Sequence, residues 1–102
     1  MNLNANKFLY VVVGVSVPGT AENVTQHYIP DGFGPVVITA RDGNSGNMFL
    51  GDSQANAQTA ANRKVLIPGQ STTLHIDDLS LLWVDAEQSG DRLEITVEKP
   101  KG

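Results

Sequence analysis

Residues 93–98 have the sequence Leu93-Glu94-Ile95-Thr96-Val97-Glu98, in which apolar and polar side chains alternate. A period of two places alternate side chains on opposite faces of a β-strand, so this stretch predicts a strand with one buried and one solvated face. Residues 72–77, Thr-Thr-Leu-His-Ile-Asp, repeat the pattern. We therefore expect the two strands to contribute to the same face of a core.

Three further segments are more continuously apolar: Phe8 to Val17, Val36 to Ala40 and Leu79 to Val84. Such segments indicate either central strands that are buried on both faces or strands whose outer face contacts another chain. Glycine- and proline-rich turn signals separate these segments from weaker strand candidates at residues 24–29, 47–50 and 64–67. The pattern predicts an all-β fold, an antiparallel β-sandwich of about eight short strands, of which the jelly roll is one form.

The chain has 102 residues, which is enough for one domain with its own core. We assign residues 8–102 to a single β-sandwich domain and residues 1–7, which are polar and rich in asparagine, to an N-terminal arm. This segment is expected to be either a frayed tail or an arm that becomes ordered on a partner. The arm supplies four candidate residues for contact with a partner or another subunit: Asn2, Leu3, Asn4 and Asn6.

Composition excludes several classes of partner and site. There is no cysteine, so neither a disulfide framework nor a thiolate metal site exists, and we expect no cofactor and no metal. The net charge of −4 opposes binding to nucleic acid. The longest apolar run is shorter than the roughly 20 residues that a membrane helix needs, and it lacks the features of a secretory signal. We therefore expect no membrane partner and a protein that is made in the cytoplasm.

Residues 52–62 differ from the rest of the chain because they contain four alanines and no β-branched run. We expect a long polar loop, with a short helical turn capped by Asp52 or Ser53 as the alternative. A loop of this kind at one end of a sandwich is often a contact surface. Its amide side chains, Gln54, Asn56 and Gln58, are therefore candidate contact residues.

No residue pattern indicates catalysis, and we expect a protein that is not an enzyme. His27 and His75 lie far from any nucleophile elbow, and the loop around Asp42 does not match a calcium-binding loop. Seven of the eleven acidic residues lie between Asp77 and Glu98. They predict either a solvated face or a surface that docks on a basic partner. Trp83 is expected in the core or at an interface, not on a sugar-binding platform.

Four phrases in the second half of the chain follow one another in a characteristic order. They are Met-Phe-Leu-Gly-Asp-Ser at 48–53, Val-Leu-Ile-Pro-Gly-Gln-Ser at 65–71, Ile-Asp-Asp-Leu-Ser-Leu-Leu-Trp-Val at 76–84 and Ser-Gly-Asp-Arg-Leu-Glu-Ile at 89–95. The proline-glycine pair of the second predicts a tight turn before a strand, and the Ser-Gly-Asp of the fourth predicts a hairpin between the strands at 79–84 and 93–97.

This order of phrases resembles that of small β-sandwich structural proteins of tailed bacteriophages. The resemblance implies a capsid decoration (cement) protein, located on the virion surface, that binds the major capsid protein at capsomer junctions and stabilises the head. It also implies a homo-oligomer, with a trimer favoured by the three-fold positions of a capsid. The alternative is a carbohydrate-binding or adhesin-type domain of a tail or head fibre.

Overall fold

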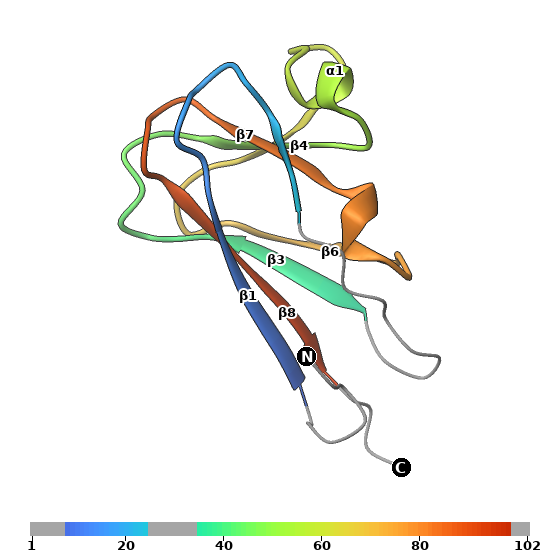
Figure 1. The fold of residues 1–102 in the computed structure, drawn as a ribbon. Coiled ribbons are helices and arrows are strands. Elements are labelled where there is room, and N and C mark those ends of the chain that lie inside the picture. The colour runs from blue at the N-terminus through green and yellow to red at the C-terminus, as the bar shows by residue number, and fades with distance from the viewer. Residues whose placement is uncertain (1–7, 25–34, 99–102) are drawn as a thin grey trace.

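The computed structural model of the chain describes residues 8–24 and 35–98 (Figure 1). Within them, eight strands form two four-stranded antiparallel sheets, which confirms the predicted all-β sandwich. Sheet A has the strand order β1 (Phe8–Gly14), β8 (Arg92–Glu98), β3 (Val36–Ala40) and β6 (Ser71–Leu74). Sheet B has the order β2 (Glu22–Asn23), β7 (Trp83–Ala86), β4 (Met48–Gly51) and β5 (Lys64–Leu66). The predicted arm, residues 1–7, lies outside the described residues.

The strand order is that of a jelly roll. Consecutive described strands lie in opposite sheets, except for β4 and β5, which pair within sheet B. β1 pairs along its whole length with β8, so the first and the last described strands are neighbours. The chain therefore wraps around the core, and no local hairpin could form sheet A by itself.

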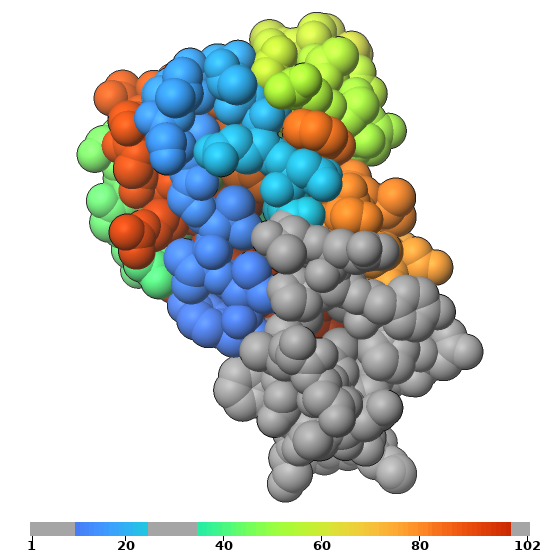
Figure 2. Space-filling view, in the orientation of Figure 1, coloured from blue at the N-terminus to red at the C-terminus, as the bar shows by residue number. Residues whose placement is uncertain are grey.

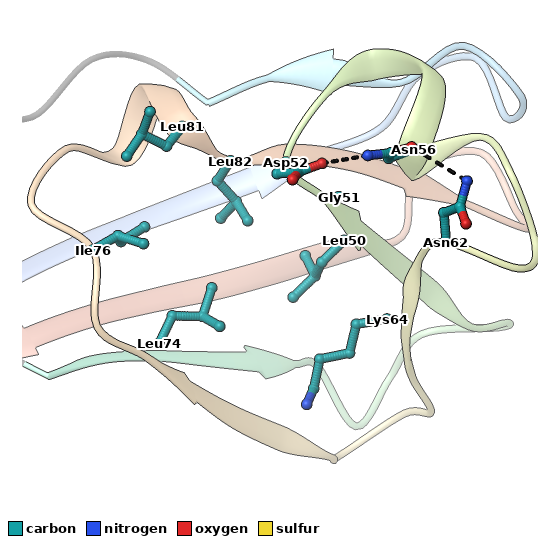
Figure 3. A pocket seen from close by; sticks show the side chains of 10 residues that line it. All are labelled: Leu50, Gly51, Asp52, Asn56, Asn62, Lys64, Leu74, Ile76, Leu81 and Leu82. Carbon is teal, nitrogen blue, oxygen red and sulfur yellow. Dashed lines mark hydrogen bonds between the residues drawn. The ribbon is translucent and has the colours of Figure 1, made fainter.

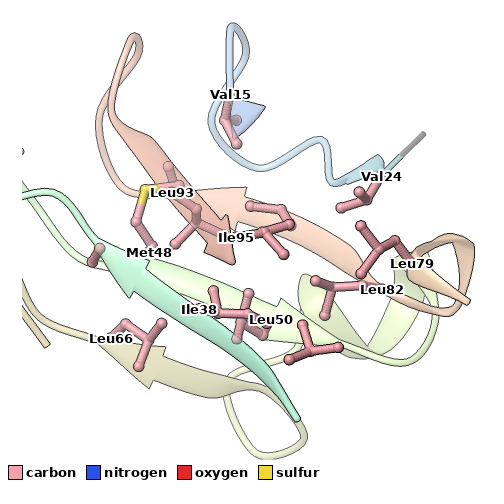
Figure 4. Packing of buried hydrophobic residues seen from close by; sticks show 14 of the residues in the cluster. Val15, Val24, Ile38, Met48, Leu50, Leu66, Leu79, Leu82, Leu93 and Ile95 are labelled. Atoms are coloured by element: carbon pink, nitrogen blue, oxygen red, sulfur yellow. The ribbon is translucent and has the colours of Figure 1, made fainter. Parts of the chain in front are cut away.

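The core lies between the two sheets, and residues 93–98 show how the sequence pattern builds it (Figure 4). Leu93, Ile95 and Val97 are fully buried, whereas the alternate residues of β8 face away from the core. Side chains of β3, β4, β5 and β7 complete the cluster, which includes Val36, Ile38, Met48, Leu50, Leu66 and Val84. In both sheets, the apolar side chains that face the other sheet are therefore buried in the core.

The three continuously apolar segments, at residues 8–17, 36–40 and 79–84, differ in the structure that they form and in their place in the sheets. β3 is a central strand, as expected, with β8 on one side and β6 on the other. The expected strand at 79–84 is wrong in its first half, because Leu79–Leu81 form a 3-10 turn, η1, and strand β7 starts at Trp83. The side chain of Asp78 accepts a hydrogen bond from the Ser80 N–H at 2.9 Å, which starts the turn in place of a strand.

β1 is not the central strand that its apolar sequence suggested. It ends at Gly14, short of the predicted Val17, and lies at the edge of sheet A with β8 as its described neighbour. The outward-facing side chains of Tyr10 and Val12 are 43% and 37% exposed. An apolar run alone cannot distinguish a buried strand from an edge strand whose outer face is uncovered.

Two turn predictions have different outcomes. Gly69 adopts a φ of +85° in the turn between β5 and β6, as the proline-glycine pair predicted. Gly90 also adopts a positive φ, but the predicted hairpin at 89–91 is wrong, since β7 lies in sheet B and β8 in sheet A. A short turn sequence predicts that the chain changes direction, but it does not predict whether the next strand belongs to the same sheet or to the other one.

Candidate functional site

The outer faces of the two sheets differ in what covers them. The outer face of sheet B is covered by the connection between β1 and β2 and by residues 52–63, which include helix α1 (Gln54–Ala57). Figure 2 shows the β1–β2 connection, in blue, against this green segment. The polar loop expected at 52–62 therefore contains one helical turn, and its N-cap is Ser53, whose side chain accepts a hydrogen bond from the Asn56 N–H at 3.1 Å.

Two predicted contact residues hold this cover together. The Gln54 side chain donates a hydrogen bond to the Ala21 carbonyl at 3.1 Å, and the Gln58 side chain accepts one from the Ala21 N–H at 2.8 Å. Both glutamines remain exposed, so these bonds leave part of each side chain accessible to solvent. Their role in the described structure is to join α1 to the β1–β2 connection.

Trp83, another predicted contact residue, lies in the same layer. It is half-buried in β7, opposite Asn23 of β2 and Gly51 of β4. Val84 and Ala86 point into the core, so Trp83 belongs to the outer face of sheet B. Of the five remaining candidates, Asn56 lies half-buried in α1, and Asn2, Leu3, Asn4 and Asn6 lie outside the described residues.

Arg63 completes the cover of sheet B from the end of the same segment. Its guanidinium carbon lies 3.4 Å from the centre of the Phe49 ring, and Phe49 is buried on the outer face of β4. A guanidinium at this distance above an aromatic face makes a cation–π contact and excludes water from the ring. This arrangement was not foreseen from the sequence, because residues 49 and 63 meet only through the β4–β5 pairing.

Replacing Arg63 with alanine is expected to lower the free energy of unfolding by about 1 kcal/mol, since the ring loses both the cation–π contact and its cover. Urea denaturation followed by Trp83 fluorescence measures the change. Lys64→Ala, at an exposed neighbouring position, is the control and should shift stability by less than about 0.5 kcal/mol. Equal losses in the two variants would contradict a specific role for the contact.

A cavity of about 700 Å³ opens between the sheets on the side of edge strands β5 and β6 (Figure 3). Its floor is aliphatic, and its polar residues are Asp52, Asn56, Asn62 and Lys64; the apolar lining residues are Leu50, Leu74, Ile76, Leu81 and Leu82. Cavities of this size and character accommodate small ligands. No motif in the sequence predicted this cavity, because its lining residues come from five separate segments of the chain.

Three polar residues at the cavity form a hydrogen-bonded chain. The Asn62 amide donates to the Asn56 side-chain oxygen at 3.3 Å, and the Asn56 amide donates to the Asp52 carboxylate at 2.5 Å. These bonds orient the asparagine amides and leave one Asp52 oxygen outside the chain. The result is a fixed set of donors and acceptors beside an aliphatic surface.

The acidic residues between 77 and 98 do not form one exposed face. Asp85 and Asp91 are only 2% and 6% exposed. One oxygen of Asp85 accepts hydrogen bonds from the N–H groups of Gly19 and Ala86, and the two oxygens of Asp91 accept from Ser45 and Gly46. Among the described residues these two carboxylates are thus turned inward to accept hydrogen bonds from backbone N–H groups, so the seven acidic residues do not share one exposed face.

The outer face of sheet A carries no helix or connection among the described residues. It consists of the alternate side chains of four strands: Tyr10, Val12, Val37, Thr39, Ser71, Thr73, Arg92, Glu94, Thr96 and Glu98. At one end of it the Arg41 guanidinium pairs with Glu94 at 3.0 Å. Hydrogen bonds with Tyr10 and then Glu94 raise the pKa of Arg41, so this cation keeps its charge at every physiological pH. The rest of the face presents hydroxyl and aliphatic groups, the Tyr10 ring and, at its two ends, the charged side chains of Arg92 and Glu98.

The two histidines of the chain are differently placed with respect to the structure. His75 is exposed between β6 and η1, and His27 lies outside the described residues. No three histidine, aspartate or glutamate side chains within residues 8–24 and 35–98 are placed to hold a metal ion. None of the described helices has the length and apolar character that crossing a membrane requires.

Comparison of the chain with protein-family models, with curated proteins and with solved structures found no match. Functional inference therefore depends on the geometry of the uncovered face of sheet A and of the cavity.

Proposed function

We propose that the chain is a non-enzymatic structural protein of a bacteriophage virion, and that it decorates the capsid surface by binding the major capsid protein at capsomer junctions. One structural observation carries the proposal: the outer face of sheet B is covered by the protein's own segments, while no described segment covers the four strands of sheet A. The order of phrases in residues 48–95 supports the choice of phage structural proteins.

The chemistry of the uncovered face suits docking on a protein surface. It presents hydroxyl groups from three strands together with Tyr10, Val12 and Val37, and its described ion pair joins Arg41 to Glu94 within the chain. A flat surface of this kind binds by summing many weak contacts, and repeated copies on a capsid add avidity. The proposal needs neither a cofactor nor a reactive group.

Expanded heads of the encoding phage, prepared without this protein, provide the test. We expect saturable binding of the purified chain in co-sedimentation, and a higher temperature of head disruption. Val37→Lys places a charge at the centre of the face and should weaken binding at least tenfold. Gln88→Lys makes the same change of charge in the exposed turn after β7 and should leave binding unchanged. Absence of binding, or equal weakening by both variants, would contradict docking through sheet A.

A second candidate function is saccharide binding, as in a fibre-associated adhesin domain. The observation that favours it is the cavity with its chain of Asn62, Asn56 and Asp52, because carboxylate and amide groups are suited to hydrogen bonding with sugar hydroxyls. A glycan array tests it. Hits that Asp52→Ala abolishes and Asp42→Ala keeps would favour saccharide binding, and an array without hits would count against it.

A further inference from the structure

The outer edge of β1, with which no strand among residues 8–24 and 35–98 pairs, differs from the other three sheet edges of the sandwich. β1 is seven residues long, while β2, β5 and β6 have two, three and four residues. Its sequence, Phe-Leu-Tyr-Val-Val-Val-Gly, contains no charge and no proline. Soluble proteins usually protect an edge strand by shortening it or by placing lysine or proline there, because its unpaired N–H and C=O groups attract another strand. β5, which contains Lys64, has such protection, whereas β1 has none.

The symmetry of β1 indicates what can occupy this edge. Two copies of a seven-residue strand that pair antiparallel around its central residue, Val11, place Val11 opposite Val11 of the second copy. In that register Tyr10 lies opposite Val12 of the second copy, and this pair occurs twice. An aromatic residue opposite a β-branched residue is a favourable cross-strand pair. The pairing covers the two exposed apolar side chains of β1.

The charges of the adjacent strand are compatible with the same register. β8 pairs Arg92 with Gly14 and Glu98 with Phe8. A Cβ built on Gly14 would lie 3.6 Å from Cγ of Arg92, so the arginine side chain lies over this glycine at the sheet edge. Antiparallel pairing places Arg92 of one copy and Glu98 of the other in the same row of the joined sheet, about 14 Å apart with the two β1 strands between them. These charges therefore neither pair across the interface nor oppose the register.

We propose that β1 pairs with β1 of a second copy in the antiparallel register centred on Val11, and that the two A sheets form one continuous eight-stranded sheet. Such pairing requires a two-fold axis, in place of the three-fold axis expected from the resemblance to capsid proteins. The uncovered faces of both copies then lie side by side and form one larger surface. The pairing concerns the protein in solution, so it stands or fails independently of capsid binding.

Light scattering coupled to size-exclusion chromatography of the full chain tests the pairing. We expect a dimer whose dissociation constant rises at least tenfold in Val12→Lys. The new lysine lies opposite Glu94 within its own sheet, so the substitution is compatible with the fold. Thr73→Lys makes a comparable change on β6, the other edge of sheet A, and should leave the dimer intact. A monomer at all concentrations, or an oligomer that Val12→Lys leaves unchanged, would overturn the proposal.

Cysteine cross-linking tests the register, because the chain contains no cysteine of its own. Under mild oxidation Val11→Cys should form a disulfide-linked dimer, since the two Cα atoms of a directly opposed pair lie within disulfide range. Val13→Cys is the control; its counterpart lies four residues along the opposite strand, and it should stay reduced. Equal cross-linking of the two variants would show that the register is wrong.

Discussion

Replacing Gly51 with alanine is expected to lower the free energy of unfolding by about 3 kcal/mol. Gly51 is the last residue of β4, and helix α1 packs directly on it. A Cβ at this position would lie 2.7 Å from Cα of Ala57 and 2.9 Å from the carbonyl carbon of Asn56, and closer still to the Ala57 N atom. All three are backbone atoms, so the clash is relieved only if α1 moves away from the sheet. Urea denaturation followed by Trp83 fluorescence measures the loss, and Trp83 pairs with Gly51 in the sheet.

Gly43→Ala provides the matched control. A Cβ at Gly43 meets no atom within 4 Å, and the backbone there has no positive φ. We expect its stability to change by less than about 0.5 kcal/mol. If alanine proves as harmless at position 51 as at position 43, the packing of α1 on β4 is incorrect.

Asp91→Asn is the second substitution with a large expected effect, a loss of about 2 kcal/mol. The two carboxylate oxygens accept hydrogen bonds from the N–H groups of Ser45 and Gly46 at 2.9 and 2.8 Å. An asparagine has a single side-chain oxygen, so its NH₂ group must face one of these two donors. One part-buried N–H is left without a partner, and the loop between β3 and β4 loses part of its attachment to the end of the chain segment that leads into β8, where Asn44 still bonds Arg92. Amide hydrogen exchange at Ser45 and Gly46 should accelerate together with the loss of stability.

Asp85→Asn is the natural comparison, because Asp85 is also buried but uses one oxygen for both of its hydrogen bonds. Oδ1 accepts from Gly19 at 2.9 Å and from Ala86 at 2.8 Å. The amide oxygen of asparagine can take this position, so we expect a loss below about 1 kcal/mol, which reflects the weaker bonds to a neutral acceptor. Equal losses at positions 85 and 91 would show that charge, and not the number of accepting oxygens, determines the effect.

The sequence predicted the class of fold because strand periodicity is a local property. The alternation of residues 93–98 identifies β8 and the residues that it buries, and Pro68-Gly69 marks the turn into β6. Position within a sheet is not local: the apolar β1 became an edge strand, and the turn at 89–91 joined two sheets. The edge position of β1 and the change of sheet at 89–91 are both determined by pairing between strands that are distant in sequence.

The site was harder to predict for the same reason. Gln54 and Gln58 looked like free contact residues, yet both bind the backbone of Ala21, more than thirty residues earlier. The cavity residues come together only when β5 and β6 face each other at the side of the sandwich. Residue type indicated that these groups were polar or apolar, but only the topology determined what they contact.

Because β1 pairs with β8, the last described strand, sheet A can form only late in biosynthesis. β8 lies between β1 and β3, so these two strands cannot be joined in sheet A until residue 98 has left the ribosome. At about 5 to 20 residues per second, β1 waits for several seconds as an apolar segment without its partner. During that wait nascent chains on one polysome are exposed to premature association through β1. Sheet A is therefore expected to form only after β8 has been synthesised, and until then chaperone occupancy of β1 should limit premature association.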